Sequence, residues 1–206
     1  MKAINHLLRH PLLLSGLLLL AACAGEDTKT SISKSADSPQ KAKGQFAFYK
    51  DIAIRPGFNF EVISWGKGTD SIGGYTILMS DSLRNNYRTL SNDRKGIVTD
   101  AWNMDLDNDG DPEIYIELLS NKNEKDLNVY EYAGGSFNKI MFPSLSDRAR
   151  KSYAGNDEFR IKNGDLFRTY PLVNPKDTSI KAGDKKYLQY RLSGNSFSIS
   201  ELEEAQ

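Results

Sequence analysis

An acidic segment with regular spacing, Asp105 to Glu113, is the part of the sequence best suited to chemistry. It consists of Asp-Leu-Asp-Asn-Asp-Gly-Asp-Pro-Glu. Carboxylates at its first, third and fifth positions converge on one centre because such a loop coils back on itself, and Gly110 supplies the sharp turn. Hard oxygen ligands at this spacing favour Ca²⁺. The sequence therefore predicts a calcium site, with these ligand residues: Asp105, Asp107, Asp109, Asp111 through its carbonyl group, and Glu113.

The predicted calcium site differs from that of an EF-hand. An EF-hand loop has a bidentate glutamate at its twelfth position, and Ile116 occupies that position here. A strand-loop-strand calcium loop fits better, and we expect the ion to stabilise the fold by neutralising carboxylates that would otherwise repel one another. The alternative is an acidic Asp/Gly turn that binds no ion tightly.

A second candidate site is the glycine-rich segment from Gly66 to Tyr75, with the sequence Gly-Lys-Gly-Thr-Asp-Ser-Ile-Gly-Gly-Tyr. Glycine lets the backbone approach a partner closely. We expect the hydroxyl groups of Ser71 and Tyr75 to lie on a protruding tip that recognises another molecule. The alternative is a flexible hairpin connection with no binding role.

The side chains that the sequence lacks exclude many kinds of catalysis. Its only histidines, His6 and His10, lie in a predicted leader, residues 1–22. Its only cysteine, Cys23, is the predicted site of lipid attachment. Ser-His-Asp and Cys-His catalysis need an imidazole base, and a zinc site normally needs histidine or cysteine. Carboxylate pairs, metal-bound phosphoryl chemistry and Ser-Lys pairs are the common arrangements that remain. We therefore predict that the protein is not an enzyme.

Residues 1–22 have the three parts of a signal peptide. The leader has a basic start, an apolar middle and small residues at its end: Lys2 and Arg9, Pro11 to Leu20, and Ala21 and Ala22. Its unbroken apolar stretch is shorter than the roughly 20 residues of a membrane-spanning helix. Because Cys23 follows directly, we predict a bacterial lipoprotein that is cleaved before Cys23 and anchored by lipid on this residue. Ala24 in the next position favours the outer membrane, at its periplasmic face or at the cell surface.

The rest of the chain divides by composition into a tether and a domain. Residues 24–44 contain no aromatic residue, and all 21 aromatic residues occur from Phe46 onward. Low hydrophobicity without periodicity predicts a disordered linker over residues 23–44, counted from the lipidated cysteine. Residues 45–206 are sufficient for a single domain with its own core. The 27 basic and 27 acidic residues are nearly balanced and scattered, which argues against nucleic acid as a partner.

Apolar residues alternate with a two-residue period through the predicted domain, which indicates half-buried strands. The clearest runs are Phe58-Phe60-Val62, Tyr75-Ile77-Met79, Ile114-Ile116-Leu118, Leu127-Val129 and Leu188-Tyr190-Leu192. Short glycine and asparagine turns favour hairpins between consecutive strands, at residues 133–136, 162–165 and 193–195. We therefore predict an all-β fold, an antiparallel meander or sandwich. One or two short helices are expected in addition, from Ser144 to about Tyr153 and after Ser80, where Leu83, Tyr87 and Leu90 have helical spacing.

Two motifs in fixed order resemble a known family. Ser71-Ile72-Gly73-Gly74-Tyr75, followed some thirty residues later by Asp-x-Asp-x-Asp-Gly-x-x-Glu and the strand Ile114-Tyr115-Ile116, is similar to the periplasmic inhibitors of invertebrate-type lysozyme. The strand pattern of residues 130–142, 155–159 and 187–192 also resembles that family, so the similarity covers roughly residues 58–200.

This resemblance implies a β-rich domain that inserts the glycine-rich loop into the active-site cleft of a lysozyme. The residues carried over to this role are Ser71, Ile72, Gly73, Gly74 and Tyr75, with hydroxyl groups directed at the catalytic carboxylates. Gly74 stands where family members often have a second serine, so one hydroxyl is missing here. Because some relatives dimerise, the resemblance also implies a homodimer as one arrangement.

Other classes of function compete with lysozyme inhibition. The acidic loop also resembles the integrin-type calcium repeat, which would imply a calcium-dependent adhesion module that binds a glycan or a host protein. Such modules usually repeat the motif over several blades, and this sequence has one copy. A carboxylate-based glycosidase would need two facing acids, and Asp70 has no identifiable partner acid in the sequence.

Overall fold

The computed structural model describes residues 46–66, 72–173, 181 and 183–203. By its contacts the chain divides into Met1–Lys41 and Ala42–Gln206, and every described residue belongs to the second unit. The predictions for the leader, Cys23 and the linker, and the role of Ser71, lie outside the described residues. In the described part, no helix combines the length and apolarity needed to cross a membrane.

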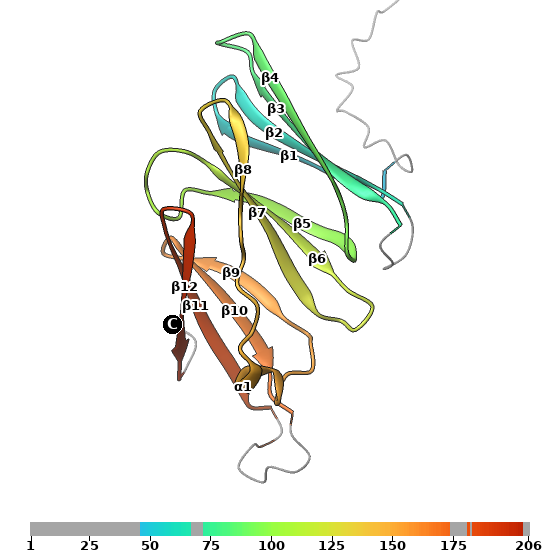
Figure 1. Cartoon of the computed structure of the whole chain (residues 1–206), viewed down its shortest axis with the longest axis vertical. Coiled ribbons are helices and arrows are strands. Elements are labelled where there is room, and N and C mark those ends of the chain that lie inside the picture. The colour runs from blue at the N-terminus through green and yellow to red at the C-terminus, as the bar shows by residue number, and fades with distance from the viewer. Residues whose placement is uncertain (1–45, 67–71, 174–180, 182, 204–206) are drawn as a thin grey trace, which may run out of the picture. The chain divides into compact units, whose positions relative to one another are not determined.

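The described residues form three antiparallel sheets of four strands each, which confirms the all-β prediction (Figure 1). The first sheet contains β1 (Phe48–Arg55), β2 (Phe58–Trp65), β3 (Gly74–Asp81) and β4 (Asn86–Asp93) in chain order. The second contains β5 (Ile97–Met104), β6 (Glu113–Leu119), β7 (Lys125–Ala133) and β8 (Ser136–Ile140), also in chain order. The third contains β9 (Glu158–Lys162), β10 (Asp165–Pro171), β11 (Lys185–Ser193) and β12 (Ser196–Leu202), in the order β12-β11-β10-β9.

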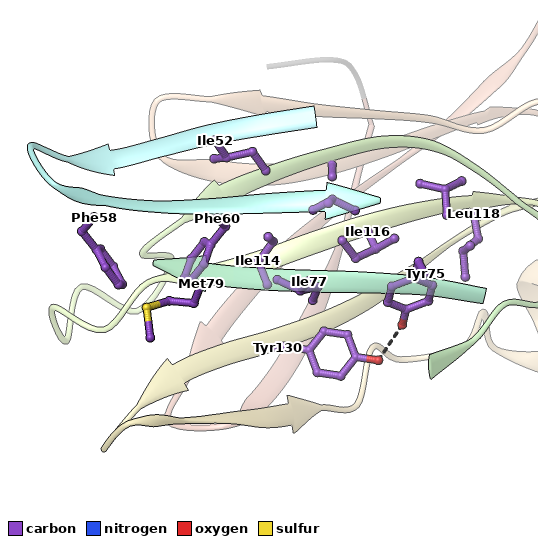
Figure 2. Close-up of a cluster of buried hydrophobic side chains, with 13 residues drawn as sticks. Ile52, Phe58, Phe60, Tyr75, Ile77, Met79, Ile114, Ile116, Leu118 and Tyr130 are labelled. Atoms are coloured by element: carbon purple, nitrogen blue, oxygen red, sulfur yellow. Dashed lines mark hydrogen bonds between the residues drawn. The ribbon is translucent and has the colours of Figure 1, made fainter. Parts of the chain in front are cut away.

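The second sheet contributes to two separate hydrophobic cores, one on each of its faces. Ile114 and Ile116 of β6 pack with Phe60 and Ile77 of the first sheet, and Figure 2 shows this first core. Tyr115, between them in sequence, belongs to a second core that includes residues of β10 and β11. Neighbouring residues of a strand point to opposite faces, so the second sheet lies between the first and the third.

Strand β6 shows the consequence of this sandwiched position. Its first six residues, Glu113 to Leu118, are all buried. In contrast, β2 alternates between buried and partly exposed residues, as expected for a strand with one covered face. The sequence correctly predicted the buried face at Ile114, Ile116 and Leu118. The same alternation places Glu113 and Glu117 on the opposite face, with Tyr115, and that burial was not predicted.

The predicted hairpin turns are confirmed by strand pairing. Residues 133–136 join β7 to β8, residues 162–165 join β9 to β10, and residues 193–196 join β11 to β12. These tight connections place consecutive strands side by side within each sheet. Residues 94–96 lead from the first sheet to the second, and residues 141–157 lead from the second to the third.

One of the two expected helices is present. Helix α1 (Asp147–Arg150) is capped by Ser146, whose side chain accepts a hydrogen bond from the Ala149 N–H group. The prediction of a second helix, after Ser80, is wrong. Residues 82–85 instead form a turn that pairs β3 with β4, and Leu83 is 78% exposed on that turn. Leu83 and Tyr87 are both exposed, so no buried apolar face favours a helix here, and the pairing of β3 with β4 decides the local structure.

Candidate metal centre

The acidic loop connects two adjacent strands of the second sheet. Strand β5 ends at Met104 and β6 begins at Glu113, and these two residues pair across the strands. The loop therefore leaves and re-enters the sheet at neighbouring positions. Leu106, its apolar residue, is buried in the second core and fixes the loop against the domain.

Four carboxylates of this loop converge, as the sequence predicted for the motif. One oxygen from each of Asp105, Asp107, Asp109 and Glu113 lies within 4.8 Å of the others. Metal–oxygen distances of about 2.4 Å allow one Ca²⁺ ion to reach ligands separated by this span. The group could therefore hold a metal ion.

Backbone N–H groups keep the loop coiled. Asp105 accepts hydrogen bonds from the N–H groups of Asp109 and Gly110, each at 3.0 Å. Asp109 accepts one from Asp111 N–H at 2.9 Å. Gly110 has φ of +90°, as expected for the sharp turn. The loop is thus closed by its own carboxylates. Both oxygens of Asp105 accept a hydrogen bond, and each carboxylate oxygen keeps a second lone pair that a cation could use.

Glu113 is the buried member of the group, with a side chain that is fully inaccessible to solvent. Its Oε2 accepts hydrogen bonds from Leu106 N–H at 2.7 Å and from the Tyr115 hydroxyl at 3.4 Å. Its Oε1 and the Oδ1 of Asp107 are buried and have no hydrogen-bond partner among the residues that the structure describes. Buried polar atoms nearly always have partners, and a cation held by this group could be the partner of both oxygens.

The electrostatics of the site also favour a cation. Burial, together with the charges of Asp107, Asp105 and Asp109, raises the pKa of Glu113 to about 7, although the Leu106 N–H group acts in the opposite direction. Among the described residues, no lysine or arginine forms an ion pair with any of the four carboxylates. Their mutual repulsion is therefore not relieved from within the described part of the protein.

The other acidic residues near the loop have different positions. The carboxylate of Asp111 is not part of the converging group, and its predicted role through the carbonyl group stays a prediction. Glu131 of β7 pairs directly with Glu113 of β6 and is 7% exposed. Burial and the charges of Asp109, Asp107 and Asp111 raise its pKa. Sequence reasoning missed Glu131 because only the strand register brings it beside the loop.

The glycine-rich segment departs from the prediction at Tyr75. Tyr75 lies in β3 and is fully buried in the first core, where its hydroxyl group is 2.6 Å from that of Tyr130 (Figure 2). The expectation that Tyr75 presents its hydroxyl on a protruding tip is therefore wrong. The alternation Tyr75-Ile77-Met79 already placed this ring on the buried face, and the glycines before it do not extend the loop as far as Tyr75.

Gly74 is also part of β3, opposite Trp65 of β2. A Cβ atom at this position would lie 2.6 Å from the Trp65 ring and 2.7 Å from the Asn92 carbonyl oxygen. A serine would clash with both groups, so packing against Trp65 requires glycine here. Gly74 therefore belongs to the structural base of the segment.

Arg94 holds the base of the glycine-rich segment. It is 1% exposed, and its guanidinium donates to the carbonyl groups of Trp65, Ile72 and Gly96. Gly66 and Gly73 lie so close that a Cβ on either would be 2.4 Å from a backbone oxygen of the facing segment. Ile72 projects from this narrow base and is 78% exposed.

The chain was also compared with known proteins. Scans against family models, curated proteins and solved structures found no match to it. The site geometry is therefore the basis for the functional proposals.

Proposed function

We propose that the β5–β6 loop binds Ca²⁺ and that the ion stabilises a non-enzymatic binding domain of the bacterial envelope. One observation carries this proposal: within a group of four converging carboxylates, two buried oxygens, on Glu113 and Asp107, have no hydrogen-bond partner in the described part of the chain. A bound cation would satisfy both oxygens and remove the repulsion.

The donor set supports Ca²⁺ over other common ions. The group offers oxygen atoms alone, from Asp105, Asp107, Asp109 and Glu113. Oxygen ligands suit Ca²⁺, Mg²⁺ and Mn²⁺, and an irregular carboxylate loop suits the flexible shell of Ca²⁺ better than the strict octahedron of Mg²⁺. Ca²⁺ is also abundant outside the cytoplasm, where the predicted lipid on Cys23 would anchor the chain.

Calorimetric titration of the full chain with Ca²⁺ and with Mg²⁺ tests this proposal. We expect one Ca²⁺ site, weaker binding of Mg²⁺, and loss of the Ca²⁺ signal in Asp105→Asn and Glu113→Gln. Asp93→Asn is the matched control, because Asp93 is exposed at the end of β4. Equal titration curves for the wild type and Glu113→Gln would contradict the proposal.

A second proposed function is lysozyme inhibition by the glycine-rich segment, in line with the family resemblance. Its support is the buried Arg94 base, which fixes the start of the segment, and the exposed Ile72 side chain next to it. A fixed base lowers the conformational entropy lost on insertion into a cleft. In this proposal Ser71 and Ile72 contact the lysozyme, and Tyr75 supports the segment from the core.

Inhibition assays with invertebrate-, chicken- and goose-type lysozymes test this second function. We expect Ser71→Ala and Ile72→Asp to weaken inhibition, and Tyr75→Phe to leave it unchanged at a temperature where the variant is folded. Leu83→Asp is the matched control, because Leu83 is equally exposed at 78% on another hairpin of the same sheet. If the Ca²⁺-loaded protein inhibits none of these enzymes, the inhibitor proposal fails and a calcium-dependent adhesion role is favoured.

A further inference from the structure

The outward face of the third sheet carries a hollow that neither proposed function uses. Leu166 and Tyr170 of β10 and Leu188 of β11 point into the second core. The residues that alternate with them, such as Phe167 and Thr169 of β10 and Tyr187 of β11, therefore point away from the core. On this face, residues of β9, β10 and β11 line a hollow of about 480 Å³.

Two aromatic rings form the floor of this hollow. Thr169 of β10 pairs with Tyr187 of β11, and Phe167 is two residues away on the same face. Phe167 and Tyr187 are thus diagonal neighbours across the strands, close enough for a ligand to contact both rings. Both side chains are only partly buried, so ring surface is open to the hollow.

Cationic side chains surround the rings. The lining includes Arg160, Lys162 and Lys185, and one acid, Glu158. Arg160 and Glu158 form an ion pair at 2.7 Å and largely cancel. Among the described residues, Lys162 and Lys185 have no ion-pair partner. The hollow therefore has an excess of positive charge in a chain whose formal net charge is zero.

We propose that this hollow binds an acidic saccharide, a sugar chain that carries carboxylate groups. The rings of Phe167 and Tyr187 would contact the apolar faces of sugar rings, and Thr169 offers a hydroxyl group between them. Lys162 and Lys185 would pair with the carboxylates. A ligand with charge alone would leave the aromatic floor unused, and a neutral sugar would leave both lysines unpaired.

Binding to defined oligomers tests this inference on the full chain. The probes are a hyaluronan oligosaccharide, a neutral chito-oligosaccharide of equal length and an oligoglutamate of equal charge, each measured with Ca²⁺ and with chelator. We expect the hyaluronan oligosaccharide to bind most tightly, independently of Ca²⁺, and to weaken as salt is raised. The Ca²⁺ comparison keeps this test separate from that of the metal site.

Variants localise the binding. Lys162→Gln/Lys185→Gln should weaken hyaluronan binding roughly five- to tenfold, because two surface ion pairs are lost. The control Lys139→Gln/Lys151→Gln removes the same charge from exposed positions elsewhere and should have little effect. Tyr187→Leu keeps an apolar residue in β11 but removes the ring, and should weaken binding of the saccharide without changing that of oligoglutamate.

Three outcomes would overturn the inference. Equal affinity for oligoglutamate would mean that charge alone is recognised. Unchanged binding in both the lysine and the Tyr187→Leu variants would place any saccharide site elsewhere. Binding to vesicles of anionic lipid, with none to the hyaluronan oligosaccharide, would identify a membrane surface as the ligand.

Discussion

Two buried carboxylates of this protein, Asp157 and Glu113, differ in how their charge is compensated. Asp157, which is 2% exposed, accepts a hydrogen bond from Arg168 at 2.6 Å, one from the Lys125 N–H group at 2.9 Å and one from the Tyr153 hydroxyl. Glu113, which is fully buried, has two hydrogen-bond donors, but within the described part of the chain no lysine or arginine pairs with it and its Oε1 has no partner.

The two regions thus differ in whether the protein itself supplies the positive charge that a buried carboxylate needs. Arg168 also donates to the Lys125 carbonyl oxygen at 3.1 Å, so the Asp157–Arg168 pair connects the third sheet to the start of β7 in the second sheet. It is a structural connection made by the chain alone. The acidic loop places charge at a similar depth without an internal cation, and we expect it to be complete only with an ion bound.

The largest effect is expected from removing the internal cation. Arg168→Met would leave the Asp157 charge buried and unpaired, and we expect a loss of about 3–5 kcal/mol in the free energy of unfolding. Urea denaturation with Ca²⁺ and with chelator should give the same loss, because the pair is independent of the ion.

The matched control for Arg168→Met also removes the negative charge of Asp157. The double variant Asp157→Asn/Arg168→Met should recover part of the lost stability. A double variant that is no more stable than Arg168→Met would show that the arginine acts through packing, for example through its contacts with the rings of Tyr153 and Phe159.

Removing the external ion should have the next largest effect. At free Ca²⁺ about a hundredfold above the dissociation constant, linkage predicts about 2.7 kcal/mol of stabilisation. For a domain of this size we expect chelation to lower Tm by roughly 5–10 °C. Calorimetry would measure it, and Glu113→Gln should abolish the difference. An unchanged Tm after chelation of the wild type would remove the contrast between the two regions.

The pH dependence sharpens the comparison further. Because burial and neighbouring aspartates raise the pKa of Glu113 to about 7, the folded apo protein binds a proton that the unfolded chain does not bind between about pH 4.5 and 7. Stability with chelator present should thus rise as pH falls through this window, by on the order of 2 kcal/mol relative to Glu113→Gln. Ca²⁺ affinity should fall over the same range, because the ion displaces that proton. Parallel curves for wild type and variant would contradict this expectation.

The smallest effect concerns Glu131, the strand neighbour of Glu113. Glu131→Gln removes one negative charge beside the site, so we expect Ca²⁺ affinity to fall by up to about fivefold. The apo protein should be slightly more stable, because repulsion with the loop is reduced. Calorimetric titration and chelated Tm measure both effects, and a gain in Ca²⁺ affinity would contradict them.

Local patterns allowed much of the fold to be predicted. The alternation at Phe58-Phe60-Val62 and the hairpin turn at residues 162–165 each depend on neighbours along the chain, and both are confirmed. The prediction failed after Ser80, where the spacing of Leu83 and Tyr87 matched a helix by chance. Leu83 and Tyr87 are exposed and only Leu90 packs against the first core, so pairing between β3 and β4 outweighs the weak periodicity.

Some residues of the candidate site could also be predicted from local spacing, and others could not. Asp105, Asp107 and Asp109 come together because the loop between them is short, so their convergence could be predicted from spacing alone. Glu131 joins them only through the register of β6 and β7, and the hollow around Tyr187 exists only because three strands align. Neither has a signal in the linear order of residues.

The sequence by itself determined the all-β class, the five clearest alternating runs, three hairpin turns and the acidic loop, because each is set by residues within a few positions of one another. Only the tertiary structure decided that the second sheet has both faces covered, that Glu113 is buried without a cation, and that Tyr75 faces Tyr130 in the core. Burial depends on what packs against a strand from distant parts of the chain, and alternation along one strand cannot show how many faces will be covered.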